Sequence, residues 1–286
     1  MTVVEEKFSK KFDEAATQPK HRGAYDKDDA GDKGMALVQA KFKDTKAYWL
    51  VAGIAGADPA DASIGSAAWA EYVVNGDIMY EVDASETPDD WPYGKISLSS
   101  NRPNHRVPHS TDSAMVYKLN PGLVEWAYQL TKDVPLDDAP KLVEFRSLFK
   151  GFPEAVKPPF VLKGDSLGAS SYWYGEVLTK WANDWVSLYS EGKGNFVMAN
   201  MEDHGTLNAL RRLSKTGMVD YNRVLVLRTA SNYSQPPPGE DVHWHFTAPF
   251  ILMGMPSFEA AHRVGGTVIH EIVDNWEKYE NKIPSS

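Results

Sequence analysis

The chain has 286 residues, of which 42% are hydrophobic and 24% are charged, the proportions of a globular protein rather than a disordered one. Its formal net charge of −9 disfavours binding to nucleic acid or to an anionic lipid surface, because both carry negative charge. The absence of cysteine excludes disulfides, thiolate metal ligands and a cysteine nucleophile.

The most apolar stretches are residues 47–57 and 246–255, and both are much shorter than the roughly 20 residues that a membrane-spanning helix needs. The first 20 residues are charged and lack the continuous apolar core of a secretory signal. We therefore expect no membrane span and a cytoplasmic or otherwise soluble intracellular location.

Residues 1–33 are rich in polar and charged side chains, and we expect a polar segment there. No linker divides the rest of the chain, so we expect a single domain over residues 34–286. Apolar side chains in residues 34–43 have helical spacing. Residues 48–52 form a continuous apolar run that stops at Gly53, which is typical of a strand buried on both faces.

Two further strands are expected over residues 67–74 and 78–82, on either side of an Asn75-Gly76 turn signal. Residues 84–112 are rich in Pro, Ser, Asp and Asn, and they predict a long loop. Such long loops in compact domains are often functional.

From residue 120 onward the pattern alternates between helices and strands. Asn120 followed by Pro121 predicts a helix start, with the helix running to Thr131. The other expected helices cover residues 140–150, 170–190, 202–215 and 257–282, the last with Ser257 as its cap, and the expected strands cover residues 160–163, 196–199 and 224–227. This alternation predicts an α/β fold with three αβα layers around a mixed, mainly parallel sheet.

Short motifs follow the expected strand ends. Residues 201–203 (Met-Glu-Asp) resemble the ribose-binding turn of the nucleoside phosphorylase superfamily, and residues 226–232 resemble its base-recognition strand end. Residues 53–59, followed by residues 75–77 (Asn-Gly-Asp), resemble its central glycine turn and the strand pair after it.

In their order along the chain, these motifs resemble the purine nucleoside permease family, a phosphorylase-like group named for transport. The resemblance runs from about residue 34 to residue 284. The segments that carry it are residues 50–59, 80–86, 171–175, 202–210, 228–236 and 275–276. It implies a nucleoside phosphorylase-like fold, a small-molecule partner that is a purine nucleoside or a mimic, and a homo-oligomer.

Two departures from the family pattern concern the nucleophile. Members usually begin with an apolar strand and a loop that helps to bind an anion, and the first thirty residues here contain no such strand. Val51 and Ile54 also stand where related phosphorylases carry Arg and Ser, and neither side chain binds an anion. These departures favour hydrolysis of the N-glycosidic bond over phosphorolysis, and they fit equally well with no glycosidic chemistry at all.

The carboxylate of Glu202 is the first expected catalytic group, because it would strengthen its hydrogen bonds to the ribose as positive charge develops on the sugar. Met201 is expected to pack under the ribose. The alternative for Glu202 is a plain role at the start of the helix, where acidic residues are favoured.

Asn232 is the second expected catalytic group, at a position where the superfamily usually carries aspartate. An amide does not titrate, so Asn232 would donate to N7 of a purine and accept from a base N–H, which suits 6-oxopurines. The alternative is an asparagine that only suits the turn before Tyr233. Trp173 and Tyr233 are expected to offer aromatic faces to the base.

The remaining expected substrate-binding residues are Gly53, Ile54, Ala55, His204, Arg228 and Ser231. For Arg228 a structural salt bridge is the alternative role, and Ser231 has no His/Asp partner in the sequence that would make a hydrolase triad. His243 and His245 would share one face of a strand, but without a third ligand nearby we expect no metal site, and we expect no cofactor.

Together these observations predict a purine nucleoside-binding protein that cleaves the N-glycosidic bond, acting as a hydrolase or glycosyltransferase. Two alternatives stay open. The pocket binds nucleoside without turnover, as an accessory to nucleoside transport, or it acts on a different small molecule.

Overall fold

The computed structural model describes residues 46–247 and 254–285. The polar segment expected over residues 1–33 and the helix expected over residues 34–43 lie outside the described residues. Within the described part, eight strands form one sheet in the order β6-β3-β8-β9-β1-β10-β2-β7. The strands are β1 (Trp49–Ala57), β2 (Ala67–Trp69), β3 (Tyr72–Asn75), β6 (Val116–Lys118), β7 (Val161–Lys163), β8 (Asp165–Gly168), β9 (Phe196–Asn200) and β10 (Val224–Tyr233).

The sheet is mixed, as the sequence predicts. The pairs β1–β10, β2–β7, β3–β8 and β8–β9 are parallel, and the pairs β1–β9, β10–β2 and β3–β6 are antiparallel. Two short strands, β4 (Tyr80–Glu81) and β5 (Lys95–Ile96), pair with each other outside this sheet.

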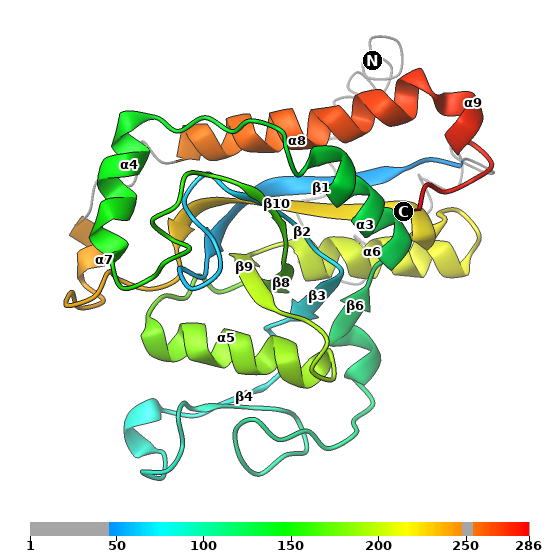
Figure 1. The fold of residues 1–286 in the computed structure, drawn as a ribbon. Helices are drawn as coiled ribbons and strands as arrows, with labels where there is room; N and C mark the ends of the chain where they lie inside the picture. The colour runs from blue at the N-terminus through cyan, green and yellow to red at the C-terminus, as the bar shows by residue number, and fades with distance from the viewer. Residues whose placement is uncertain (1–45, 248–253, 286) are drawn as a thin grey trace, which may run out of the picture. The chain divides into compact units, whose positions relative to one another are not determined.

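Helices cover both faces of the sheet, which confirms the three-layer α/β arrangement (Figure 1). Two adjacent residues of β8 point to opposite faces of the sheet: Leu167 packs against residues of α5, whereas Ser166, directly before it, donates to Asp203 at the start of α6. The helices are α3 (Pro121–Thr131), α4 (Pro140–Arg146), α5 (Glu176–Tyr189), α6 (Asp203–Lys215), α7 (Trp244–Thr247), α8 (Gly254–Asp274) and α9 (Trp276–Tyr279).

The longest helix, α8, packs on β1 and β10, and Figure 1 shows it along one side of these strands with α5 on the other. Gly265 allows this close approach, since a Cβ there would lie 3.1 Å from Leu50 and 3.4 Å from Leu227. None of the helices within residues 46–247 and 254–285 combines the length and hydropathy that crossing a membrane requires.

Strands β1 and β10 extend well beyond the apolar runs that predict them. They pair in parallel from Trp49 opposite Val224 to Ala57 opposite Tyr233, with a register shift after Ala55. This pairing, rather than hydrophobicity, keeps the polar residues near the end of β10 in the strand. It carries those residues to the edge of the site described below.

The hairpin expected around Asn75-Gly76 is wrong. Asn75 ends β3, whose partners are β6 and β8 rather than the segment that follows it in sequence. The amide oxygen of Asn75 accepts from the backbone N–H of Asp77 at 2.8 Å, which turns the chain away from the sheet. Gly76 is needed for space, because a Cβ there would lie 2.8 Å from Leu167.

Other boundaries differ for local reasons. Asn120 caps α3 as expected, accepting from two backbone N–H groups of the first turn. The helix expected from residue 170 begins only at Glu176, after Gly175 with a φ of 128°. Ser257 lies inside α8 instead of capping it, and its hydroxyl donates to the carbonyl of Ala230 at 2.6 Å.

A buried carboxylate joins three segments at the start of β8. Asp165 accepts from the backbone N–H groups of Glu71 and Tyr72 at 3.0 and 2.7 Å, and from that of Asn195 at 2.8 Å. Burial nevertheless raises the pKa of Asp165 from 3.8 to about 6, because desolvation of the charge outweighs these donors.

We predict that Asp165 makes the fold less stable as pH rises. The native state holds this proton up to about pH 6, whereas the unfolded chain loses it near pH 3.8, so the contribution is fully present below pH 3.8 and is lost by about pH 6. The difference in free energy of unfolding between wild type and Asp165→Asn should fall over that window by about 1–3 kcal/mol. Urea unfolding at several pH values measures it, and a difference that stays flat or grows with pH would contradict the prediction.

Candidate functional site

A cavity of about 240 Å³ opens where the last residues of β1, β9 and β10 meet the loop before α5. Four separate stretches of the chain contribute to its wall. The lining residues are Ile54, Ala55, Gly56, Ser171, Tyr172, Trp173, Ala199, Asn200, Met201, Glu202, Ser231, Asn232 and Ser234.

The apolar part of the wall includes the indole of Trp173, which the core holds in place. Its ring lies edge-on to Trp181 with centroids 5.6 Å apart, and it packs at a tilt on Phe196 at 6.0 Å. Met201 also lines the cavity and is 48% exposed. The cavity therefore offers one fixed aromatic surface and one flexible thioether side chain.

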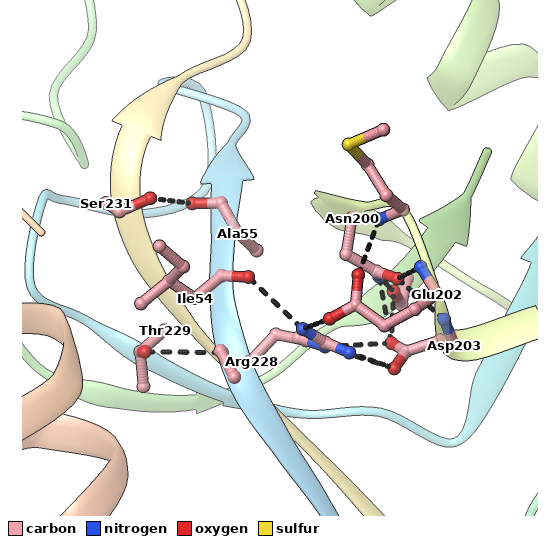
Figure 2. Close-up of polar contacts among 11 residues, drawn as sticks. Ile54, Ala55, Asn200, Glu202, Asp203, Arg228, Thr229 and Ser231 are labelled. Carbon is pink, nitrogen blue, oxygen red and sulfur yellow. Dashed lines mark hydrogen bonds and ion pairs between the residues drawn. The ribbon is translucent and has the colours of Figure 1, made fainter. Parts of the chain in front are cut away.

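A buried ion pair lies directly behind the cavity. The Arg228 side chain is only 2% exposed, and its Nε donates to both carboxylate oxygens of Asp203 at 3.1 Å. Nη2 of Arg228 also pairs with Asp203, whose side chain is fully buried. Figure 2 shows the guanidinium between β1 and the start of α6, and its Nη1 donates to the carbonyl of Ile54 at 3.2 Å.

The same guanidinium holds Glu202. Nη1 of Arg228 donates to Glu202 Oε1 at 2.8 Å. Burial alone would lower the pKa of Arg228, but Asp203 and Glu202 outweigh it and raise that pKa, so the arginine stays charged. The salt-bridge role expected as the alternative for Arg228 is the one that the structure shows.

Gly53 makes room for this arginine and does not line the cavity. A Cβ on Gly53 would lie 2.5 Å from Arg228 Nη1, so the guanidinium would have to shift away from the position in which it pairs with Asp203. Gly53 therefore acts on the site through Arg228, not by contact with a ligand.

Glu202 lines the cavity with a carboxylate whose two oxygens each have a protein partner, Oε1 being the one that Arg228 holds. Oε2 accepts from the backbone N–H of Met201 at 3.0 Å, and the side chain is 59% exposed. Glu202 does stand at the N-cap position of α6, as its alternative role requires, but its side chain makes no cap hydrogen bond there. Asn200 caps α6 instead, accepting from the backbone N–H groups of Glu202 and Asp203 at 3.1 and 2.9 Å.

Asn232, across the cavity on β10, has its amide held by three neighbours. Nδ2 donates to the carbonyl of Tyr233 at 3.1 Å and to Tyr172 Oη at 3.2 Å. Ser231 Oγ lies 3.1 Å from Asn232 Oδ1 and donates equally well to the carbonyl of Ala55 at 3.1 Å. Both hydrogens of the amide are thus directed to the protein.

Tyr172 connects the cavity to the segment that contains α7. Its hydroxyl forms a 2.8 Å hydrogen bond with His245 Nε2, and the two rings stack with centroids 5.4 Å apart. Tyr174 stacks on His245 as well, at 4.1 Å. Burial lowers the pKa of His245.

Besides Gly53 and Arg228, two more of the residues expected to bind substrate lie outside the cavity lining. Tyr233 is 1% exposed, its ring packs on Phe149 at 4.0 Å, and its hydroxyl donates to the carbonyl of Ala155. Neither face of Tyr233 is therefore open to a ligand. His204 points away from the cavity lining and pairs with Asp77, its Nε2 lying 3.0 Å from Asp77 Oδ2.

His243 and His245 would share one face only on a strand, and the structure has no strand there. Trp244 begins the short helix α7, which places the two histidines in a turn and a helix rather than on one strand face. Within the described residues, no group of three or more His, Asp or Glu side chains has the geometry of a metal site.

The sequence analysis gave no roles to Asp203, Asn200 and Tyr172. One signal for Asp203 was available, since Arg228 interrupts the otherwise apolar run of β10 and a buried arginine requires a buried partner. Asn200, directly before the Met-Glu-Asp motif, was a candidate helix cap. For Tyr172 we find no comparable signal, because its contacts join segments far apart in the sequence.

The comparison with known families settles where the chain belongs. It matches the family described as Purine nucleoside permease (NUP) over residues 24–284. The chain belongs to the purine nucleoside permease family. The family expected from the sequence motifs is thereby confirmed.

Relatives within the family are moderately similar. A purine nucleoside permease of Candida albicans is 33% identical over 245 residues, which cover 84% of this chain and 60% of that protein. A Schizosaccharomyces pombe protein named "Probable purine nucleoside permease" is 30% identical over 261 residues, which cover 87% of this chain and 74% of that protein. This permease-family chain thus spans about 60% of the length of its Candida relative.

Among solved structures, a Streptococcus pneumoniae MTA/SAH nucleosidase in complex with 8-aminoadenine matches with a TM-score of 0.44 and 13% identity, over 84% of this chain and 75% of that one. A futalosine hydrolase of Helicobacter pylori matches with a TM-score of 0.44 and 16% identity, over 84% and 74%.

We predict that Arg228→Met destabilises the fold by about 3–5 kcal/mol, because it leaves the fully buried carboxylate of Asp203 without its charged partner. As the control, Arg263→Met removes a pair with Glu259 in which both side chains are nearly half exposed, and it should cost less than about 1 kcal/mol. Chemical denaturation measures both. Equal losses in the two variants would show that the buried pair has no special role.

Proposed function

We propose that the cavity binds a purine nucleoside, with the ribose at Glu202 and the base between Trp173 and Asn232. The observation that carries this proposal is that Glu202 and Asn232, 30 positions apart in the sequence, line one cavity. Membership of the purine nucleoside permease family supports the choice of ligand.

Glu202 is suited to ribose hydroxyls because its carboxylate is already oriented. One oxygen accepts from Arg228 and the other from the Met201 N–H, and each oxygen retains a further lone pair. Binding therefore immobilises little side-chain freedom at this position, which favours affinity. A hydrogen bond from a neutral hydroxyl to a carboxylate is also stronger than one between neutral groups.

The rest of the wall favours a nucleoside over a nucleotide. The described lining contains no lysine or arginine, so nothing there would pair with a phosphate. The volume of about 240 Å³ lies just below the range of about 300–1,000 Å³ for drug-sized ligands and suits a single small heterocycle with its sugar. The same lining offers no cationic side chain for the phosphate that phosphorolysis requires.

Hydrolysis of the N-glycosidic bond is the second candidate function, and the position of Glu202 favours it. A carboxylate beside the ribose stabilises the positive charge that the sugar acquires as the bond breaks. The departing purine also needs a donor at N7, however, and both amide hydrogens of Asn232 are directed to Tyr172 and Tyr233. Binding without turnover is therefore the function that the geometry supports best.

We predict that inosine binds to the wild-type protein and that Glu202→Gln weakens binding about 10- to 100-fold, because the charged acceptor for the ribose is lost. Titration calorimetry measures the affinities. Glu259→Gln, which removes an exposed surface carboxylate, serves as the control and should bind as wild type does.

Chromatography of the same mixtures tests turnover. Inosine should remain intact with and without added phosphate. An unchanged affinity in Glu202→Gln would remove the ribose subsite, and rapid release of hypoxanthine without phosphate would establish hydrolysis in place of binding alone.

A further inference from the structure

The orientation of the Asn232 amide is fixed by an atom that can only accept. The backbone carbonyl of Tyr233 lies 3.1 Å from the amide, so the atom facing it must be the nitrogen. The second hydrogen of that nitrogen is directed to Tyr172 Oη at 3.2 Å. Asn232 consequently has no amide hydrogen left to offer to a ligand.

The oxygen of the same amide keeps unused capacity. Its one described partner is Ser231 Oγ at 3.1 Å, and the single hydroxyl proton of Ser231 is shared with the carbonyl of Ala55. An amide oxygen has two lone pairs, so at least one remains for the cavity that Asn232 lines. Towards a ligand, Asn232 is an acceptor only.

Two atoms accept the amide hydrogens of Asn232, and only Tyr172 Oη belongs to a side chain. A substitution can remove it, whereas the other acceptor is the backbone carbonyl of Tyr233. The Tyr172 side chain is 56% exposed, and its hydroxyl is tied down by the 2.8 Å bond to His245 Nε2. The His245 ring in turn stacks on the rings of both Tyr172 and Tyr174. The pair Tyr172–His245 therefore determines whether the second amide hydrogen is occupied.

We propose that Tyr172 is a positioning residue for base selection. Its hydroxyl, held by His245, accepts the second amide hydrogen of Asn232, so that Asn232 can only accept from a ligand. The site is therefore selective for nucleosides whose base presents an N–H donor. This inference rests on the proposed nucleoside binding. Inosine offers its N1–H and adenosine its 6-amino group. Purine riboside, which has no 6-substituent, presents only acceptor nitrogens, and these repel an acceptor.

The test compares the dissociation constants of purine riboside and inosine by titration calorimetry. In the wild-type protein the ratio should be about fivefold or more, the worth of one net hydrogen bond. In Tyr172→Phe one amide hydrogen is freed beside the cavity and can donate to a ring nitrogen, so the ratio should fall below about twofold. A general loss of structure would weaken both ligands and leave the ratio unchanged.

Tyr174→Phe is the matched control. Tyr174 also stacks on His245, but its hydroxyl has no hydrogen-bond partner within the described residues and Tyr174 does not line the cavity. This variant should keep the wild-type ratio. His245→Phe retains the aromatic stack while removing Nε2 from Tyr172, and it should lower the ratio in the same direction as Tyr172→Phe.

The outcomes separate the inference from the proposed function. If the wild-type protein binds neither inosine nor purine riboside, the proposed function fails. If it binds inosine and both Tyr172→Phe and His245→Phe keep the wild-type ratio, nucleoside binding stands and the role of Tyr172 is overturned. Should Tyr172→Phe fail to fold in a thermal melt, the ratio measured in His245→Phe decides.

Discussion

The pairing of Arg228 with Asp203 is the constraint on which the site depends. Two buried charges are tolerated only where their partners are fixed, and here the guanidinium reaches from β10 across β1 to the start of α6. That reach requires Gly53 on β1, because any side chain there would meet the guanidinium. It also places Glu202, the residue directly before Asp203, at the cavity wall. A structural ion pair thus positions Glu202, so that the core sets the position of the carboxylate that we propose to bind the ribose.

Much of the fold could be predicted from local sequence patterns, and the predictions that failed did so for physical reasons. An apolar run that stops at Gly53 predicted β1, an apolar run that stops at Arg228 predicted β10, and Asn120 predicted the start of α3. β8 was missed because Asp-Ser-Leu-Gly has no strand pattern of its own, and it is a strand because β3 and β9 flank it. The hairpin predicted at Asn75-Gly76 was wrong although its local turn signal was strong. The glycine is needed there because a side chain would clash with Leu167, not because the chain forms a hairpin.

The sequence predicted those residues of the candidate site that stand in a recognisable motif at the end of a strand. Met201, Glu202 and Asn232 all line the cavity, because the ends of β9 and β10, which run in opposite directions, both lie beside the last residues of β1. The prediction that Tyr233 faces the base failed. Tyr233 follows Asn232 directly, and adjacent side chains of a strand point to opposite faces, so Tyr233 lies in the core and packs on Phe149. The contacts of Tyr172 depend on α7, which no sequence pattern placed beside the loop before α5.

A crystal structure of the protein grown with inosine and phosphate tests the central claim most directly. We predict that the nucleoside occupies the cavity, with its ribose hydroxyls within hydrogen-bond distance of the Glu202 carboxylate and a base N–H on Asn232 Oδ1. Inosine bound elsewhere, or a cavity that stays empty at saturating inosine while the Arg228–Asp203 pair is intact, would contradict the account.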